Sequence, residues 1–66
     1  MTPTVFRHIR QALGLSAEGL ARVLQVSSGR TVRRWEAGDR DIPGPVRVLM
    51  LLLKSGVITP DDLALA

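Results

Sequence analysis

The sequence predicts an all-α fold of four or five short helices, and three observations support this class. Apolar residues recur three and four positions apart, which is the spacing of a helix face. Cap residues and glycine stops divide the chain into short segments. No segment alternates between apolar and polar residues with the period of two that a strand requires. With 66 residues, 45% of them hydrophobic and 23% charged, the chain has the composition of one folded domain spanning residues 1–66.

The first predicted helix begins with Thr2 as its cap and Pro3 at the first helical position, where a missing amide costs little. Its apolar face is formed at helical spacing by Val5, Phe6, Ile9 and Leu13. Gly14 ends this helix, because glycine readily adopts the left-handed conformation of a helix stop.

The second predicted helix begins at the cap residue Ser16, with Glu18 near the positive end of its dipole. Its apolar face consists of Leu20, Ala21 and Leu24. Gly19 lowers its intrinsic helix propensity by about 1 kcal/mol relative to alanine, so packing has to make up the difference. Residues 25–29 are rich in serine and end in glycine, which predicts a break.

The third predicted helix runs from about Gly29 or Arg30 to Ala37, and Gly38 ends it. Val32 and Trp35 are expected to point inward. The opposite side carries Arg30, Arg33 and Arg34.

The fourth predicted helix begins at the Pro43-Gly44-Pro45 segment and ends at Gly56. Its residues are apolar almost all round. The core positions are predicted to be Val46, Leu49, Leu52 and Leu53. Thr59 and the residues after it form a cap and first turn, which predicts a last short helix over residues 60–65.

The charge of +3 is unevenly distributed along the chain. Residues 1–34 carry a net charge of +5, and residues 35–66 carry −2. Eight of the nine basic residues are arginine. This asymmetry favours an anionic partner for the first half, either a nucleic acid or an acidic membrane surface.

The sequence lacks the residues that several classes of function require. With Cys 0 and only one histidine, His8, the sequence predicts no metal site and no cofactor. His8 has no acid partner on its helix face, and Ser27 and Ser28 lie in a capping context, so no catalytic site is predicted. The longest apolar stretch is six residues, where a membrane span needs roughly 20, and the first residues do not resemble a secretory signal. We therefore expect a cytoplasmic protein without a membrane partner or an evident small-molecule ligand.

An arginine-bearing helix preceded by a tight connection and a second helix can read DNA. The major groove admits an α-helix, and the planar guanidinium of arginine donates two parallel hydrogen bonds to O6 and N7 of guanine. Residues 16–27, SAEGLARVLQVS, followed by residues 31–38, TVRRWEAG, resemble the helix-turn-helix of the Cro and lambda-repressor-like (XRE-type) DNA-binding proteins. The likeness extends from about Phe6 to Leu53, with the helix-turn-helix over about residues 16–38.

The resemblance implies a set of DNA contacts. Contacts to base edges are expected from Gly29, Arg30, Thr31, Arg33 and Arg34. Contacts to phosphates are expected from Ser16, Ala17, Ser27, Ser28 and Arg40. For the two adjacent serines, capping of the third helix is an alternative, and for the arginines the alternative is a solvated face that attracts DNA without sequence preference.

The resemblance also implies a salt bridge between Arg10 and Glu36, which would tie the first helix to the third. Two features depart from the family pattern. Ala17 stands where the family often has a glutamine that clamps a phosphate, and Gln25 replaces the usual turn glycine in a connection that is one residue longer. The longer connection leaves the first residue of the third helix open.

Apolar residues left over from the core predict a homodimer. The expected interface, within a dimerisation helix and tail over about residues 43–66, consists of Val48, Met50, Leu51, Leu63 and Leu65. The alternative is that the last helix folds back and covers the apolar residues of the fourth.

The predicted function is that of a homodimeric transcriptional regulator, a repressor that binds an inverted-repeat operator in double-stranded DNA. Such a protein would be associated with the nucleoid of a prokaryote or a phage-infected cell. Phage Cro-like switches, regulators encoded beside anti-CRISPR genes and autorepressing antitoxins all fit this description. A different class is also open, an antitoxin-type protein-binding module that neutralises a partner toxin.

Overall fold

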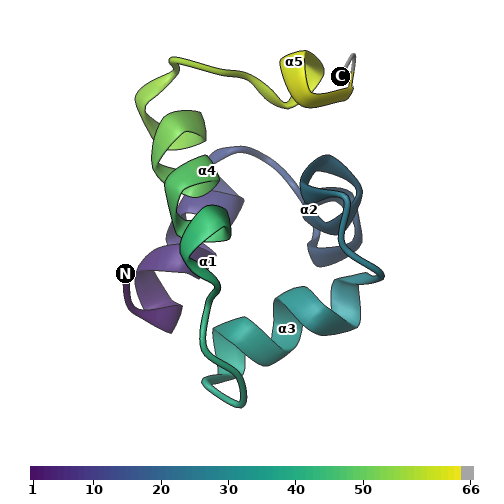
Figure 1. Cartoon of the computed structure of the whole chain (residues 1–66), viewed down its shortest axis with the longest axis vertical. Coiled ribbons are helices and arrows are strands. Elements are labelled where there is room, and N and C mark those ends of the chain that lie inside the picture. The colour runs from purple at the N-terminus through teal and green to yellow at the C-terminus, as the bar shows by residue number, and fades with distance from the viewer. Residues whose placement is uncertain (65–66) are drawn as a thin grey trace.

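The computed structural model describes residues 1–64, which form five helices and no strand. The helices are α1 (Pro3–Ala12), α2 (Ala17–Leu24), α3 (Gly29–Ala37), α4 (Gly44–Ser55) and α5 (Pro60–Ala64). The predicted all-α class is confirmed. Figure 1 shows α3 and α5 at opposite ends of the longest dimension, which measures 30 Å.

The caps that divide the chain are made as the sequence predicts at three of the helices. The hydroxyl of Thr2 accepts a hydrogen bond from the amide of Val5 at the start of α1. At the start of α2, the hydroxyl of Ser16 accepts one from the amide of Gly19 at 3.0 Å. Thr59 and Asp62 form a reciprocal pair at α5, in which each side chain accepts from the backbone amide of the other.

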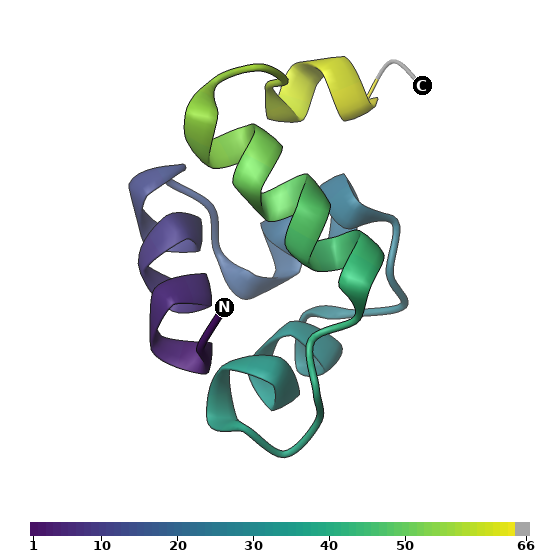
Figure 2. The same cartoon turned by 60° about the vertical axis from the view of Figure 1, so that its left-hand side comes forward.

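The core lies where α1 to α4 meet, and α5 packs against α2 (Figure 2). Nine apolar residues are buried in it: Phe6, Ile9, Leu20, Ala21, Val32, Trp35, Val46, Met50 and Leu53. The rings of Phe6 and Trp35 pack edge to face, with the centroids 5.8 Å apart and the planes at 75°. This aromatic contact joins α1 to the buried side of α3.

Two predictions about the core are wrong. The side chain of Val5 is 41% exposed, since Phe6 and Ile9 already fill the space beneath α1. On α4 the fully buried residue is Met50, while the expected core residues Leu49 and Leu52 are only partly buried. Val46, Met50 and Leu53 recur every three or four positions, and this face of α4 turns to the core.

Candidate nucleic-acid interface

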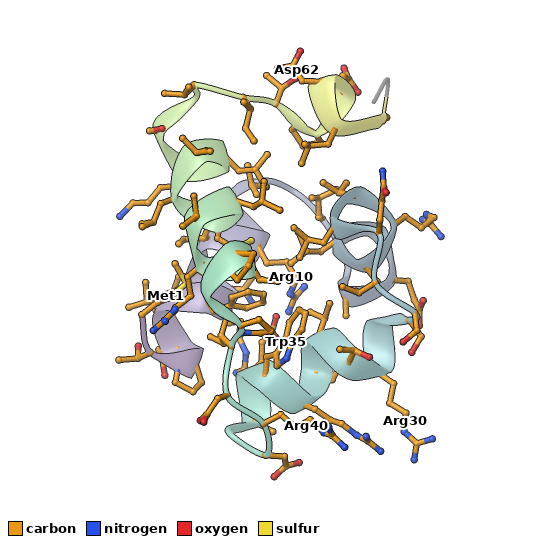
Figure 3. All side chains as sticks on the ribbon, in the orientation of Figure 1. Met1, Arg10, Arg30, Trp35, Arg40 and Asp62 are labelled. Atoms are coloured by element: carbon orange, nitrogen blue, oxygen red, sulfur yellow. The ribbon has the colours of Figure 1, made fainter. Side chains whose placement is uncertain are left out.

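The two sides of α3 differ sharply in burial. Val32 is fully buried and Trp35 is 4% exposed, as predicted. On the other side Arg30 and Arg33 are exposed and Arg34 is partly buried. Figure 3 shows the side chain of Arg30 extending away from the body of the domain. The described part of the chain therefore leaves the arginine-bearing side of α3 open to solvent.

The turn before α3 places its first residue at Gly29. Gln25 adopts a left-handed conformation with φ 59° after the end of α2, at the position where a glycine is usual in the XRE-type pattern. Ser28 then occupies the cap position of α3 in an extended conformation. The longer connection is thus accommodated before the helix, and the predicted register of the arginines relative to Trp35 holds.

The serines of this turn do not cap α3 through their side chains. Ser28 stands at the cap position without a side-chain hydrogen bond to the helix. The hydroxyl of Ser27 instead lies 3.2 Å from that of Thr31, on the first turn. The capping alternative is therefore wrong, and both hydroxyls remain candidates for phosphate contact.

Gly29 is buried against the first turn of α2. A Cβ atom on Gly29 would come within 2.7 Å of the carboxyl carbon of Glu18 and within 2.8 Å of its backbone nitrogen. Such distances are shorter than van der Waals contact, so only glycine fits without a shift of one helix. Gly29 is buried and carries no side chain, so only its backbone could meet a base, and its predicted base contact stays a prediction.

The start of α2 presents groups that suit a phosphate. Ser16 is exposed, and because its oxygen accepts from Gly19, its hydroxyl hydrogen is left to donate elsewhere. Ala17 is partly buried at the first position of the helix, where backbone amides lack a partner within the helix.

Arg40 lies in the connection between α3 and α4, at the end of the domain that also holds α3 (Figure 3). It lines a hollow of about 340 Å³ together with Asp41 and Arg47. Arg47, on the first turn of α4, was not predicted as a phosphate contact. Sequence spacing offered no signal for it, because only the course of the connection brings these two arginines to one hollow.

The predicted ion pair between Arg10 and Glu36 is present. Nε of Arg10 lies 2.6 Å from Oε2 of Glu36, and Nη2 lies 3.0 Å from Oε1. Nη1 of Arg10 also donates to the carbonyl of Leu15, so the guanidinium joins α1, α3 and the connection after α1. The hydrogen bonds that Arg10 donates to Glu36 raise the pKa of the guanidinium above its usual value. The ion pair therefore keeps its contribution to stability until the pH exceeds the usual range of arginine titration.

Arg7 is a second partner of Glu36 that sequence reasoning missed. Its Nε lies 3.4 Å from Oε1, and its side chain is 52% exposed, whereas that of Glu36 is only 5% exposed. The spacing of three between Arg7 and Arg10 places both on one face of α1 and could have indicated this contact. Both arginines therefore serve the fold, and neither belongs to the open side of α3.

The predicted dimer residues fall into different environments. Val48 is 57% exposed and Leu51 is 54% exposed on the outer face of α4. The expectation for Met50 is wrong, because its side chain is fully buried in the core. Leu63 packs against the core from α5, and Leu65 lies outside the described residues. Val57, 70% exposed just after α4, adds an apolar residue that the sequence did not single out.

Within residues 1–64 no helix is long and apolar enough to cross a membrane, and no three side chains of the metal-binding types lie close enough together to share an ion.

A comparison with protein families identifies one match. The family described as helix-turn-helix domain matches residues 4–66, which is nearly the whole chain. No curated protein and no solved structure matches this chain. Domains of this kind place a helix in the major groove of DNA, and the match indicates a DNA-binding protein that acts in the regulation of transcription.

Proposed function

Because the chain belongs to the helix-turn-helix domain family, we propose that it is a homodimeric transcription repressor that binds an inverted-repeat operator in double-stranded DNA. α3 is then the recognition helix. Repression requires only that the promoter be occupied, which a dimer of this domain would accomplish without a further activity.

The observation that carries the proposal is the division of α3 into two sides. Val32 and Trp35 anchor the recognition helix to the core, and this fixes the direction in which Arg30 and Arg34 leave it. A guanidinium at either position is suited to O6 and N7 of a guanine. Arg33 and Thr31 flank them, with Arg33 available to a base or a phosphate and Thr31 to a phosphate or a thymine methyl.

The phosphate contacts are assigned to groups on both sides of the recognition helix. Ser16 and the amide of Ala17 lie before it, with the hydroxyls of Ser27 and Ser28 at its start. Arg40 follows it, and Arg47 shares the hollow of Arg40. Contacts on both flanks would hold the recognition helix at one depth and orientation in the groove.

A dimer is proposed because one recognition helix makes too few base contacts to select a site among the competing sequences of a genome. The outer face of α4, with Val48 and Leu51, is the apolar surface available to a second copy. Two recognition helices related by a twofold axis would enter successive major grooves, with half-site centres about 34–36 Å apart.

The test measures binding of the purified protein to the DNA upstream of its own gene, with fluorescence anisotropy at several salt concentrations as the readout. We expect a complex that is selective over random DNA, weakens as salt rises and contains two chains per duplex. Binding without preference over random DNA would contradict the operator. A stable complex of the α4 face with the product of a neighbouring reading frame, in a protein that does not self-associate, would favour the protein-binding module.

A further inference from the structure

Glu18 lies at the junction between the first turn of α2 and the first turn of the recognition helix. Its carboxyl carbon and Oε1 both lie 2.7 Å from the position that a Cβ atom of Gly29 would take. The first residue of the recognition helix thus has no side chain, and a carboxylate from the neighbouring helix lies close beside it.

This carboxylate is free to bind a ligand. Glu18 is exposed, and among residues 1–64 no hydrogen bond or ion pair involves its side chain. The only ion pairs in that part of the chain are those of Glu36 with Arg7 and Arg10. Glu18 is also the only acidic residue among residues 1–34, which otherwise carry six arginines.

The surroundings explain why a negative charge is tolerated there. The positive end of the α3 dipole points toward this position, and Ser28 does not satisfy the first amides of the helix with its side chain. Contact with Gly29 limits the space into which the carboxylate can move. The acceptor oxygens therefore lie close to the end of the helix that enters the groove.

From this arrangement we infer that Glu18 is a specificity-determining residue, whose carboxylate accepts a hydrogen bond from the exocyclic amino group of a base in the major groove. Only cytosine N4 and adenine N6 offer such a donor, whereas guanine and thymine present acceptors there that the carboxylate repels. The inference rests on the proposed function. It adds one base pair to the half-site, next to the pair read by Arg30, and assigns its readout to α2.

The experiment is enrichment of DNA duplexes from a randomised pool by the full chain, by Glu18→Ala and by Glu18→Gln. The unmodified protein should enrich one base pair at one outer position of each half-site, by about fivefold or more over the other three pairs. Glu18→Ala should reduce that preference to less than about twofold and leave the positions read by the arginines unchanged. Glu18→Gln should select adenine there, because an amide both accepts from N6 and donates to N7.

The matched control is Asp61→Ala, which removes the same charge from an exposed position on α5, the helix at the opposite end of the domain from α3 (Figure 1). It should leave every base preference unchanged. Thermal denaturation establishes that each variant is folded, which is expected because Glu18 is exposed and alanine favours helix.

The outcomes separate the two proposals. If the unmodified protein enriches a half-site and Glu18→Ala enriches the same sequence at every position, the role of Glu18 is wrong and the proposed function stands. If the unmodified protein enriches no sequence at all, the proposed function is wrong, and the readout by Glu18 with it.

Discussion

The guanidinium of Arg10 and the carboxylate of Glu36 form a two-point ion pair, with Nε to Oε2 at 2.6 Å and Nη2 to Oε1 at 3.0 Å. Glu36 lies one residue after Trp35 on α3, so this pair ties the last turns of α3 to α1. Both side chains are largely buried, at 16% and 5% exposed, which makes the loss of either partner costly.

Arg10→Ala should therefore lower the free energy of unfolding by about 3 kcal/mol, because it leaves the Glu36 carboxylate buried with only the looser contact from Arg7. Urea denaturation followed by circular dichroism measures this. Arg7→Ala is the control, and its cost should stay below about 1 kcal/mol, as is usual for an exposed pair. Equal losses from the two variants would contradict the assignment of Arg10 as the main partner.

Gln25→Gly should stabilise the domain by about 0.5–1 kcal/mol, since it removes the strain of a left-handed backbone but adds freedom to the unfolded chain. The measurement is a shift of the thermal midpoint to higher temperature. The control is Gly38→Ala, which adds a side chain where the glycine has φ 80°. A Cβ atom there meets nothing within 4 Å, so the expected loss of stability reflects backbone strain alone. A destabilised Gln25→Gly variant would show that the glutamine side chain contributes more than the strain costs.

Arg34→Ala and Arg40→Ala should weaken DNA binding in different ways. Loss of a base contact at Arg34 should cost about 1–3 kcal/mol on the operator and relax the preference at one position per half-site. Loss of a phosphate contact at Arg40 should weaken operator and random DNA alike and reduce the salt dependence by about one unit of slope. Titrations of both duplexes at several salt concentrations check this. Equal losses on operator and random DNA for Arg34→Ala would count against base readout.

Met50 and Leu51 are neighbours in sequence, but Met50 is buried and Leu51 is exposed, which gives a paired test of the dimer. Met50→Ala should lower the free energy of unfolding by about 2–5 kcal/mol, because it opens a cavity in the core. Leu51→Glu should leave the folded monomer intact and abolish self-association, because Leu51 is 54% exposed. Sedimentation equilibrium distinguishes the two effects. A Leu51→Glu variant that still dimerises would place the interface elsewhere.

Gly29→Ala should destabilise the domain by about 1–3 kcal/mol, although alanine is the better helix former. The reason is the backbone nitrogen of Glu18, only 2.8 Å from the position of the added carbon, which cannot rotate away as a side chain could. Gly19→Ala is the comparison inside α2, where the nearest atom is the flexible hydroxyl of Ser16 at 3.2 Å. Gly19→Ala should stabilise the domain. If Gly29→Ala stabilises it equally, the starts of α2 and α3 can move apart without cost.

Helix positions and the inward residues of α3 follow from the sequence, because caps and glycine stops act over only a few residues. Thr2, Ser16 and Thr59 cap as their types predict. Val32 and Trp35 are buried as their spacing predicts, and with them the outward direction of the arginines is set.

The face that α4 buries could not be predicted in the same way. Its residues are apolar almost all round, so periodicity does not distinguish Met50 from Leu49 or Leu52. Only the position of α4 against α1, α2 and α3 decides that Met50 is inside. The same limit applies to the contact between Glu18 and Gly29 and to the hollow shared by Arg40 and Arg47, because these residues are brought together by tertiary packing.

The edge-to-face contact of Phe6 with Trp35 has a practical consequence. Trp35 is the only tryptophan of the chain, and its ring lies on the back of the helix whose front carries the arginines. Its intrinsic emission is therefore a label-free signal with two uses. A red shift reports that the indole has become wet as the domain opens, and a smaller change in intensity on mixing with a duplex reports that the same helix has docked.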